Sequence, residues 1–205
     1  MEKIKWGIIG PGNIANNFAD GLKGSYSGQL VSIASKSEDR RKNFGDKYDI
    51  HPDFRFDSYE DIINSEHIDA IYISTPHTLH AQWTIKAAGK GKHILCEKPG
   101  AINFNEGKKI IDAVREAGVF YMEGFMYRCH PQIPKLVEII KNKIIGDVIS
   151  VETSFGFDMG KTIPDHRLFN KNLAGGGILD VGLYPISFSR LIAGVATGDK
   201  FSEPK

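Results

Sequence analysis

Apolar and polar residues follow two different rhythms along the first 120 or so positions of the chain. Short apolar, β-branched runs are typical of buried strands, and they lie at residues 4–9, 29–35, 54–56, 69–74, 93–96 and 119–122. Amphipathic stretches between them predict helices at residues 13–22, 38–48, 58–64, 78–88 and 105–117, with 38–48 exposed. Regular alternation of strands and helices indicates an α/β fold with a doubly wound parallel sheet, and we assign it to residues 1–124.

The pattern changes after Glu123, where a polar junction precedes a predicted helix at residues 133–143. Apolar residues then alternate with more polar ones at 149–157, which predicts a long strand with one buried face, as in antiparallel sheets. Three glycines at 175–177 lead into a second predicted helix at 178–192. We therefore expect residues 125–205 to form a second domain of the α+β class with mostly antiparallel sheet.

The composition excludes several classes of protein. At 41% hydrophobic, 25% charged and a net charge of +1, the chain is an ordinary globular sequence that indicates neither nucleic acid nor an anionic membrane as partner. No apolar stretch looks long enough to cross a bilayer, and the chain enters its first strand without an export signal. Two cysteines, Cys96 and Cys129, fit a reducing compartment, so we expect a cytoplasmic protein.

The first strand runs into the glycine-containing turn at residues 10–15, with the spacing G-x-G-x-x-A. Gly10 permits a tight turn, Gly12 allows a close backbone approach, and the small Ala15 lets the next helix lie against the strand. The first N–H groups of that helix have no partner within it and can hold a pyrophosphate. The spacing therefore predicts a dinucleotide-binding Rossmann fold, and a plain glycine turn is the alternative.

The end of the second strand predicts which dinucleotide binds. A site selective for NAD usually carries Asp or Glu there, but this chain has Ser35, Lys36 and Ser37, followed by Arg40 and Arg41. Hydroxyl and cationic groups would bind a 2′-phosphate through charge-assisted hydrogen bonds. We therefore favour NADP over NAD. If Lys36 and Arg40 merely begin a solvated helix, the choice stays open.

Lys98 is the first candidate for chemistry, because it follows a predicted strand directly and precedes Pro99. Ligands of open α/β sheets bind beyond the carboxyl ends of the strands. Beside a cationic nicotinamide ring, like-charge repulsion and desolvation would lower the pKa of this lysine. It could then polarise a substrate hydroxyl or carbonyl. The Lys98–Pro99 bond is a candidate for the cis form, and a solvated loop lysine is the alternative.

Asp180 and Tyr184 are the second candidates. They lie four positions apart on a predicted helix and so share one face. A phenol and a carboxylate there could handle the substrate proton while hydride is transferred. Alternatively, Asp180 pairs locally and Tyr184 packs in the core.

Metal binding is not expected from the histidines or cysteines. His77 and His80 lie three positions apart, but no nearby cysteine or carboxylate completes a ligand set. Cys96 has no base placed to activate it, so we expect a buried, inert thiol.

Four motifs together resemble the glucose–fructose oxidoreductase and inositol dehydrogenase family, in the branch of the dimeric dihydrodiol (D-xylose) dehydrogenases. They are GPGNIA at 10–15, STPHTLH at 74–80, CEKP at 96–99 and GGGILDVGLY at 175–184. The glycine turn alone is weak evidence for the family. The motifs at 96–99 and 175–184 are specific when they occur together. The tyrosine at position 184 is similar to this branch, since many other members carry histidine.

The resemblance implies the roles of individual residues. Lys98, Asp180 and Tyr184 would form the catalytic group, with Tyr184 as the acid and base. The implied cofactor contacts are Gly10, Gly12, Asn13, Ile14, Ser35, Lys36, Arg40, Thr75, Pro76, His77, Glu97 and Lys98. His77 departs from the asparagine common in the family, which puts its contact in doubt.

The resemblance also implies that relatives continue into a large C-terminal sheet, through which they commonly dimerise. Only its first strand and the catalytic helix are expected here, so we interpret residues 125–205 as a truncated substrate and oligomerisation domain. The main hypothesis is an NAD(P)-dependent oxidoreductase for a sugar, polyol or cyclic diol. The alternatives are a truncated NADP-binding module without turnover and, less favoured, a Rossmann regulator or scaffold.

Overall fold

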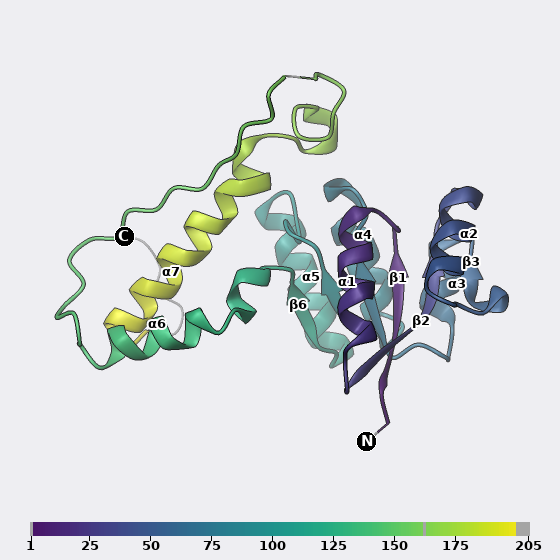
Figure 1. Cartoon of the computed structure of the whole chain (residues 1–205), viewed down its shortest axis with the longest axis horizontal. Helices are drawn as coiled ribbons and strands as arrows, with labels where there is room; N and C mark the ends of the chain where they lie inside the picture. The colour runs from purple at the N-terminus through teal and green to yellow at the C-terminus, as the bar shows by residue number, and fades with distance from the viewer. Residues whose placement is uncertain (1, 162, 200–205) are drawn as a thin grey trace. The chain divides into compact units, whose positions relative to one another are not determined.

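The computed structural model describes residues 2–161 and 163–199. The chain divides into two compact units, Met1–Gly124 and Phe125–Lys205 (Figure 1). We call them the N-terminal unit and the C-terminal unit.

The N-terminal unit contains one parallel sheet of six strands in the order β3-β2-β1-β4-β5-β6. The strands are β1 (Ile4–Ile9), β2 (Gly28–Ala34), β3 (Arg55–Phe56), β4 (Ala70–Ile73), β5 (His93–Cys96) and β6 (Tyr121–Glu123). The order runs outward from β1 in one direction and from β4 in the other. This is the doubly wound topology predicted from the sequence, and its switch point lies between β1 and β4.

Helices connect successive strands of this sheet. They are α1 (Asn13–Lys23), α2 (Glu38–Lys47), α3 (Tyr59–Asn64), α4 (His80–Ala88) and α5 (Phe104–Ala117). Two short 3₁₀ turns, η1 (Pro52–Phe54) and η2 (His77–Leu79), precede β3 and α4. The predicted helix at 78–88 therefore begins as a tighter turn and becomes an α-helix at His80.

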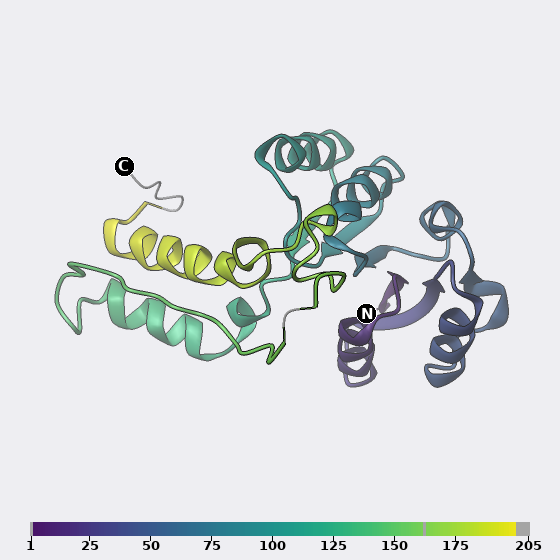
Figure 2. The same ribbon diagram turned by 90° about the horizontal axis from the view of Figure 1, so that it is seen from above.

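Both faces of the sheet are covered. Figure 2 shows α1 and α2 on one side and α4 and α5 on the other. Side chains alternate between these faces: Ile8 and Tyr72 pack in the core beneath α1 and α2, and Ile9, Ile71 and Ile73 pack in the opposite core. Because both faces are buried, the central strands are continuously apolar rather than alternating.

Local signals in the sequence explain where several helices begin and end. The Ser58 hydroxyl accepts hydrogen bonds from the backbone N–H groups of Glu60 and Asp61, at 3.1 and 3.3 Å, and so caps α3. Gly118 ends α5 with a φ of 64°, a conformation that favours glycine. The prediction that 38–48 is exposed was wrong in part, because Phe44 and Tyr48 are buried in the core beneath α2.

The C-terminal unit contains two main helices, α6 (Gln132–Lys141) and α7 (Leu183–Thr197), which pack against each other. Shorter elements are the 3₁₀ turns η3 (Met126–Cys129) and η4 (Lys171–Leu173) and the π-helical turn η5 (Ile178–Gly182), which leads into α7. The predicted helices at 133–143 and 178–192 are therefore present, the second with a wider first turn.

The predicted long strand at 149–157 is not present. Within residues 2–161 and 163–199 this segment pairs with no other strand, and Ile149 and Phe157 are 92% and 56% exposed. It runs extended beside α7 (Figure 2), where the Thr153 hydroxyl lies 3.2 Å from that of Ser189. A strand is stabilised by its hydrogen-bonded neighbours, and the described chain supplies none. The expected antiparallel sheet is thus a correction to the predicted fold of residues 125–205.

Among the residues that the structure describes, one helical stretch, Lys171–Thr197, is long and apolar enough to cross a membrane by length and composition; an 18-residue window within it has a mean hydropathy of 1.4. The sequence-based expectation that no apolar stretch is long enough to cross a bilayer stays a prediction, because this stretch qualifies by length and composition only. The stretch carries charges at Lys171, Asp180 and Arg190, so it contains no unbroken apolar run. Length and composition alone are weak evidence for a membrane span, because core helices can meet the same criterion.

Candidate functional site

The loops after β1 and β4 meet at the switch point of the sheet. Ile9 and Ile73 are paired at the ends of these strands, and the Ser74 hydroxyl donates a hydrogen bond to the Gly10 carbonyl at 2.8 Å. Gly10 has a φ of 89°, and a Cβ there would lie 3.0 Å from the Ser74 carbonyl oxygen. Both the left-handed backbone and the close approach therefore favour glycine at this position.

Gly12, the N-cap of α1, lies in a different environment. A Cβ on Gly12 would meet no atom within 4 Å, no side chain caps the helix, and its first turn contains no acidic residue. Asn13 and Ile14 are exposed in that first turn, and Ala15 is fully buried against the sheet. The positive end of the helix dipole is thus open to an anion, and the fit to a pyrophosphate is good.

The carboxyl end of β2 carries the residues predicted to select NADP. Ser35 is buried. Its backbone carbonyl accepts a hydrogen bond from Nη1 of Arg41 at 2.7 Å, and its side-chain hydroxyl accepts one from the backbone N–H of Ser37. Lys36 is exposed, with its Nζ 5.8 Å from the centre of the Tyr59 ring. Arg41 therefore braces the backbone, while Lys36 provides a cation at the surface.

Arg40 is also exposed at this end of the sheet. Burial raises the pKa of Tyr59, and the positive charge of Arg40 opposes that rise. Tyr59 is thus an aromatic neighbour of both cations, a contact that the sequence pattern did not reveal.

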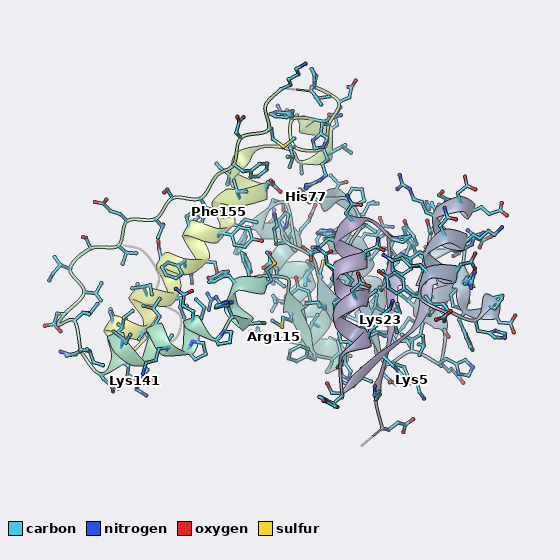
Figure 3. The ribbon with its side chains drawn as sticks, in the orientation of Figure 1. Lys5, Lys23, His77, Arg115, Lys141 and Phe155 are labelled. Atoms are coloured by element: carbon cyan, nitrogen blue, oxygen red, sulfur yellow. The ribbon has the colours of Figure 1, made fainter. Side chains whose placement is uncertain are left out.

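The segment after β4 contains Thr75, Pro76 and His77. Thr75 and His77 are buried, each 7% exposed, whereas Pro76 is exposed. Within the described part of the chain, the Thr75 hydroxyl has no hydrogen-bond partner. A buried, unsatisfied hydroxyl is uncommon in folded proteins, and at the carboxyl end of a central strand it is available to a bound ligand. His77, labelled in Figure 3, lies with its ring centre 5.9 Å from that of His80.

The segment after β5 contains Glu97, Lys98 and Pro99, and buried side chains hold it in place. The Tyr72 hydroxyl donates a hydrogen bond to Glu97 Oε1 at 2.6 Å. The Lys98–Pro99 peptide bond is cis. The Pro99 carbonyl oxygen lies 2.7 Å from Nδ1 of His80.

The next residue, Gly100, is held from the other side of the segment. Its N–H donates a hydrogen bond to Glu123 Oε1 at 2.8 Å, and a Cβ at this position would collide with the Tyr121 hydroxyl. Lys98 therefore belongs to a backbone segment that is anchored at the residues before and after it.

Burial dominates the electrostatics around this segment. Desolvation raises the pKa of Glu123. The hydrogen bond from the Gly100 N–H and the interaction with His80 partly oppose this rise. Burial also raises the pKa values of Tyr72 and Tyr121, and it raises the pKa of the Cys96 thiol to about 12. Cys96 is therefore a neutral thiol at physiological pH, in line with the inert role expected for it.

Asp180 and Tyr184 both belong to the C-terminal unit. Asp180 is 6% exposed in η5, and its Oδ1 forms an ion pair with the Arg167 guanidinium at 3.5 Å. Because η5 is a π-helical turn, the α-helical spacing that predicted one shared face for Asp180 and Tyr184 does not apply there. The observed π-turn itself is a feature often found at functional sites.

Tyr184, in the first turn of α7, is surrounded by aromatic rings. The ring centres of Phe155, Phe125 and Tyr127 lie 5.1, 5.7 and 6.1 Å from that of Tyr184. Figure 3 labels Phe155 beside α7. Aromatic packing of this kind restricts the ring of Tyr184.

Sequence reasoning missed the residues that hold the loops. His80 was considered only as a metal ligand, yet each of its ring nitrogens lies 2.7 Å from a backbone carbonyl oxygen. Both ring nitrogens therefore contact the backbone. Nothing in the sequence indicated that Tyr72 and Glu123 hold these loops. Tyr72 lies within a predicted strand, and Glu123 directly follows one.

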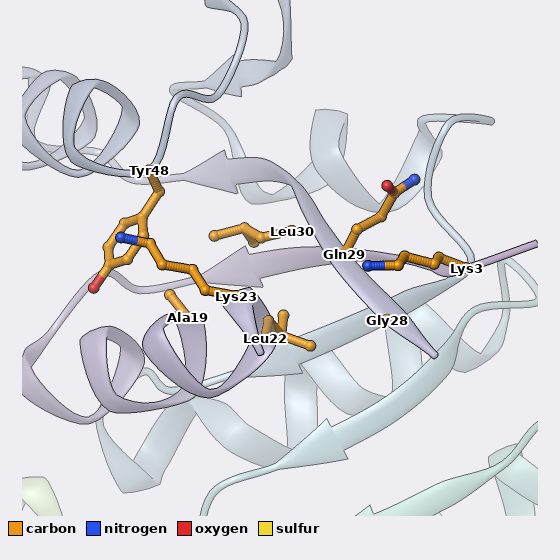
Figure 4. A pocket seen from close by; sticks show the side chains of 8 residues that line it. All are labelled: Lys3, Ala19, Leu22, Lys23, Gly28, Gln29, Leu30 and Tyr48. Carbon is orange, nitrogen blue, oxygen red and sulfur yellow. The ribbon is translucent and has the colours of Figure 1, made fainter. Parts of the chain in front are cut away.

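A separate pocket of about 210 Å³ lies at the other end of α1 (Figure 4). It is lined by Lys3, Ala19, Leu22, Lys23, Gly28, Gln29, Leu30 and Tyr48. None of the predicted site residues contributes to it.

Comparison with known families and proteins supplies an independent test. Residues 4–125 match the family described as "Oxidoreductase family, NAD-binding Rossmann fold", and residues 133–198 match the GFO/IDH/MocA C-terminal domain. The chain is 34% identical over 201 residues to trans-1,2-dihydrobenzene-1,2-diol dehydrogenase of Mus musculus, covering 97% of this chain and 59% of the relative. It is 35% identical over 191 residues to D-xylose 1-dehydrogenase (NADP(+)) 2 of Haloferax volcanii, covering 93% and 58%.

A solved structure agrees with these matches. Aldose–aldose oxidoreductase from Caulobacter crescentus, complexed with glycerol, superimposes with a TM-score of 0.85 at 28% identity, over 96% of this chain and 58% of the other. The chain thus spans somewhat less than three-fifths of the length of these proteins. The matched regions and the parallel sheet with its glycine turn lead to one conclusion: the chain belongs to the glucose–fructose oxidoreductase and inositol dehydrogenase (GFO/IDH/MocA) family of oxidoreductases, with an NAD-binding Rossmann fold.

Proposed function

We propose that the protein is an oxidoreductase that transfers a hydride between a CH–OH carbon and a nicotinamide cofactor, with NADP favoured over NAD. One observation carries the proposal. The loops that begin at Gly10, Ser74 and Glu97 follow β1, β4 and β5, three adjacent strands of one parallel sheet. Ligands of open α/β sheets bind at this edge.

The cofactor would be held by residues whose surroundings fit its phosphates. The pyrophosphate would lie at Gly10, Gly12 and the first turn of α1, where Asn13 and Ile14 are exposed. The 2′-phosphate of NADP would be bound by Ser35, Lys36 and Arg40. A carboxylate is absent from positions 35–37, and the relative from Haloferax volcanii carries NADP(+) in its name.

Further cofactor contacts are proposed in the loops after β4 and β5. These are Thr75, Pro76, His77, Glu97 and Lys98. The unsatisfied Thr75 hydroxyl supports this assignment. When bound, the nicotinamide would accept or supply the hydride.

The proton would be handled by this chain's own side chains. Tyr184 would take the proton from, or give it to, the substrate oxygen. The positive charge of Lys98 would lower the pKa of the Tyr184 hydroxyl. Asp180 would orient the substrate or Lys98. The anchored backbone around Lys98 and the aromatic cluster around Tyr184 support these roles, because general acids and bases need fixed positions.

The proposed substrate class is a sugar, polyol or cyclic diol. The names of the relatives from mouse and Haloferax volcanii, a dihydrodiol dehydrogenase and a D-xylose dehydrogenase, support this class. We also propose a cytoplasmic location, since both Cys96 and Cys129 are free thiols. Exposed apolar residues at 149 and 157 support association into a dimer through this segment.

The test begins with a fluorescence titration of the chain with NADPH and with NADH, followed by a turnover screen over sugars, polyols and cyclic diols. Lys98→Met should lower turnover by at least about 100-fold, because it removes a charge needed in proton transfer. NADPH binding should stay within a few-fold of the unchanged chain. The matched control is Lys90→Met, an exposed lysine after α4, which should change neither quantity.

Three results would count against the proposal. Unchanged turnover in Lys98→Met would remove the role of this lysine, and failure to bind either nucleotide would favour a regulator or scaffold. Binding without turnover in the unchanged chain would favour the alternative function, an NADP-binding module. Asp180→Asn and Tyr184→Phe, tested in the same assay, separate the roles of the two residues.

A further inference from the structure

His80 is a fully buried histidine at the first position of α4, and both of its ring nitrogens contact backbone carbonyls. Nδ1 lies 2.7 Å from the carbonyl oxygen of Pro99, and Nε2 lies 2.7 Å from that of Thr75. A carbonyl oxygen can only accept a hydrogen bond. Each nitrogen must therefore donate one.

A neutral imidazole cannot satisfy this geometry, because it carries a single N–H. In either tautomer, one nitrogen lone pair would face a carbonyl lone pair at 2.7 Å. Rotating the ring by 180° would place carbon atoms against both oxygens and leave two buried carbonyls without donors, which is costly. The doubly protonated imidazolium is the form in which both contacts are hydrogen bonds.

We propose that His80 is a doubly protonated positioning residue, which ties the loop after β4 to the loop after β5. Its significance for catalysis rests on the proposed function, because those two loops carry Thr75 and Lys98. The protonation state rests on geometry alone.

The place of His80 in the sheet explains why such a tie is needed. The ladder between β4 and β5 ends at the pair Ile73 and Cys96, followed by a hydrogen bond from the Glu97 N–H to the Ile73 carbonyl at 2.9 Å. The parallel ladder between the two strands ends here. The His80 ring lies between the carbonyl oxygens of Thr75 and Pro99, so a side chain connects the loop after β4 to the loop after β5.

A buried cation requires a compensating negative charge. Glu123, on β6, is the acidic group that interacts with His80: this interaction lowers the pKa of the carboxyl, although burial holds that pKa above its ordinary value. Glu97, after β5, is a second acidic group near Glu123, and its negative charge adds to the rise in the pKa of Glu123. His77, in η2, is the other titratable neighbour on this side, with its ring 5.9 Å away.

Two further features bear on the charge. Cys96, on β5, stays neutral because its pKa is about 12. The N-terminus of α4 disfavours a cation, but this effect of the helix dipole is smaller than the loss of a charge-assisted buried hydrogen bond. The protonated form is therefore inferred from the two carbonyl contacts of the ring nitrogens.

The experiment measures the ring directly in the unchanged 205-residue chain. Histidine side chains are labelled with ¹⁵N, and correlation spectra are recorded at pH 7.5. The resonance of His80 is assigned by its loss in His80→Gln, and His67→Gln, an exposed histidine of the same unit, is the control for assignment. We expect both nitrogens of His80 to show an attached hydrogen. A nitrogen without one would overturn the proposal.

The second measurement tests positioning. His80→Gln can donate to one carbonyl but not to two in opposite directions, so NADPH affinity should fall about 10-fold and kcat should fall further. His67→Gln should leave both unchanged. Should His80→Gln fail to fold, the spectrum of the unchanged chain still decides the protonation state, with assignment by elimination from variants of the other histidines.

The two proposals fail separately. If the unchanged chain binds no nucleotide but His80 carries two ring hydrogens, the proposed function is wrong and the protonation state stands. If NADPH binds and His80 is neutral, the imidazolium is wrong and the function stands. If His80→Gln binds and turns over NADPH as well as the unchanged chain does, His80 is not a positioning residue.

Discussion

The two units of this chain bury their apolar residues to very different degrees. In the N-terminal unit, two cores cover both faces of a parallel sheet, and half of its strand residues are buried. In the described part of the C-terminal unit, Ile140 and Ile192 are the apolar side chains that are buried, while Ile178 and Ile186 are 73% and 54% exposed. Because burial of apolar surface is the main stabilising contribution to folding, the first unit should be much the more stable of the two.

The largest expected difference between the units is in thiol reactivity. Cys96 is fully buried with a pKa of about 12, whereas Cys129 is exposed. At pH 8 the thiolate of Cys96 is on the order of one in ten thousand molecules, so Cys129 should react with a thiol reagent at least ~1,000-fold faster. Kinetics with Ellman's reagent measure this difference. Cys129→Ser should abolish the fast phase, and a second fast thiol in that variant would show that the sheet opens near β5.

The next largest effect comes from removing a core side chain in each unit. Ile73→Ala should lower the free energy of unfolding of the N-terminal unit by about 2–5 kcal/mol, because Ile73 is fully buried in the central sheet. Ile192→Ala should act on the C-terminal unit, at the lower end of that range, since few buried neighbours surround it. Urea unfolding followed by two probes separates the effects.

Both tryptophans, Trp6 and Trp83, lie in the N-terminal unit. Tryptophan fluorescence therefore reports on that unit, and far-UV circular dichroism reports on both. Ile192→Ala should shift the circular dichroism transition and leave the fluorescence midpoint in place. If both probes shift equally, the units unfold together and their stabilities are not separate.

Smaller effects are expected from alanine at the two glycines of the turn after β1, where one substitution should act on stability and the other on cofactor binding. Gly10→Ala should cost about 1–2 kcal/mol of stability, because alanine is strained at a positive φ and its Cβ would meet the Ser74 carbonyl. Gly12→Ala should cost less than about 1 kcal/mol, since its φ is −92° and no atom lies nearby. It should nevertheless weaken NADPH binding about 10-fold. Equal losses of stability in both variants would contradict this division.

The sequence predicted the N-terminal unit well because its signals are local. Each strand is a short apolar run, Ser58 caps a helix that ends as expected, and Gly118 ends another. A buried parallel sheet needs no information beyond the order of these elements, since connections between adjacent parallel strands follow a fixed hand. The loops with Gly10, Thr75 and Lys98 then meet the same sheet edge as a consequence of topology.

The remaining features depend on contacts between distant residues. The contacts of His80 with Thr75 and Pro99 require the tertiary fold, as does the bond between Glu123 and Gly100. Alternating residues at 149–157 satisfy the pattern of a strand, but a strand also needs a neighbour to pair with. The π-turn before α7 is equally invisible to a pattern with a 3.6-residue period.

Gly100 has a practical consequence for protein engineering. Its missing side chain makes room for the Tyr121 hydroxyl, while its N–H is bound by Glu123. A side chain introduced at position 100 alone would therefore require the Tyr121 hydroxyl to move. Shortening Tyr121 to phenylalanine first would free space there, so this pair of positions should be varied jointly.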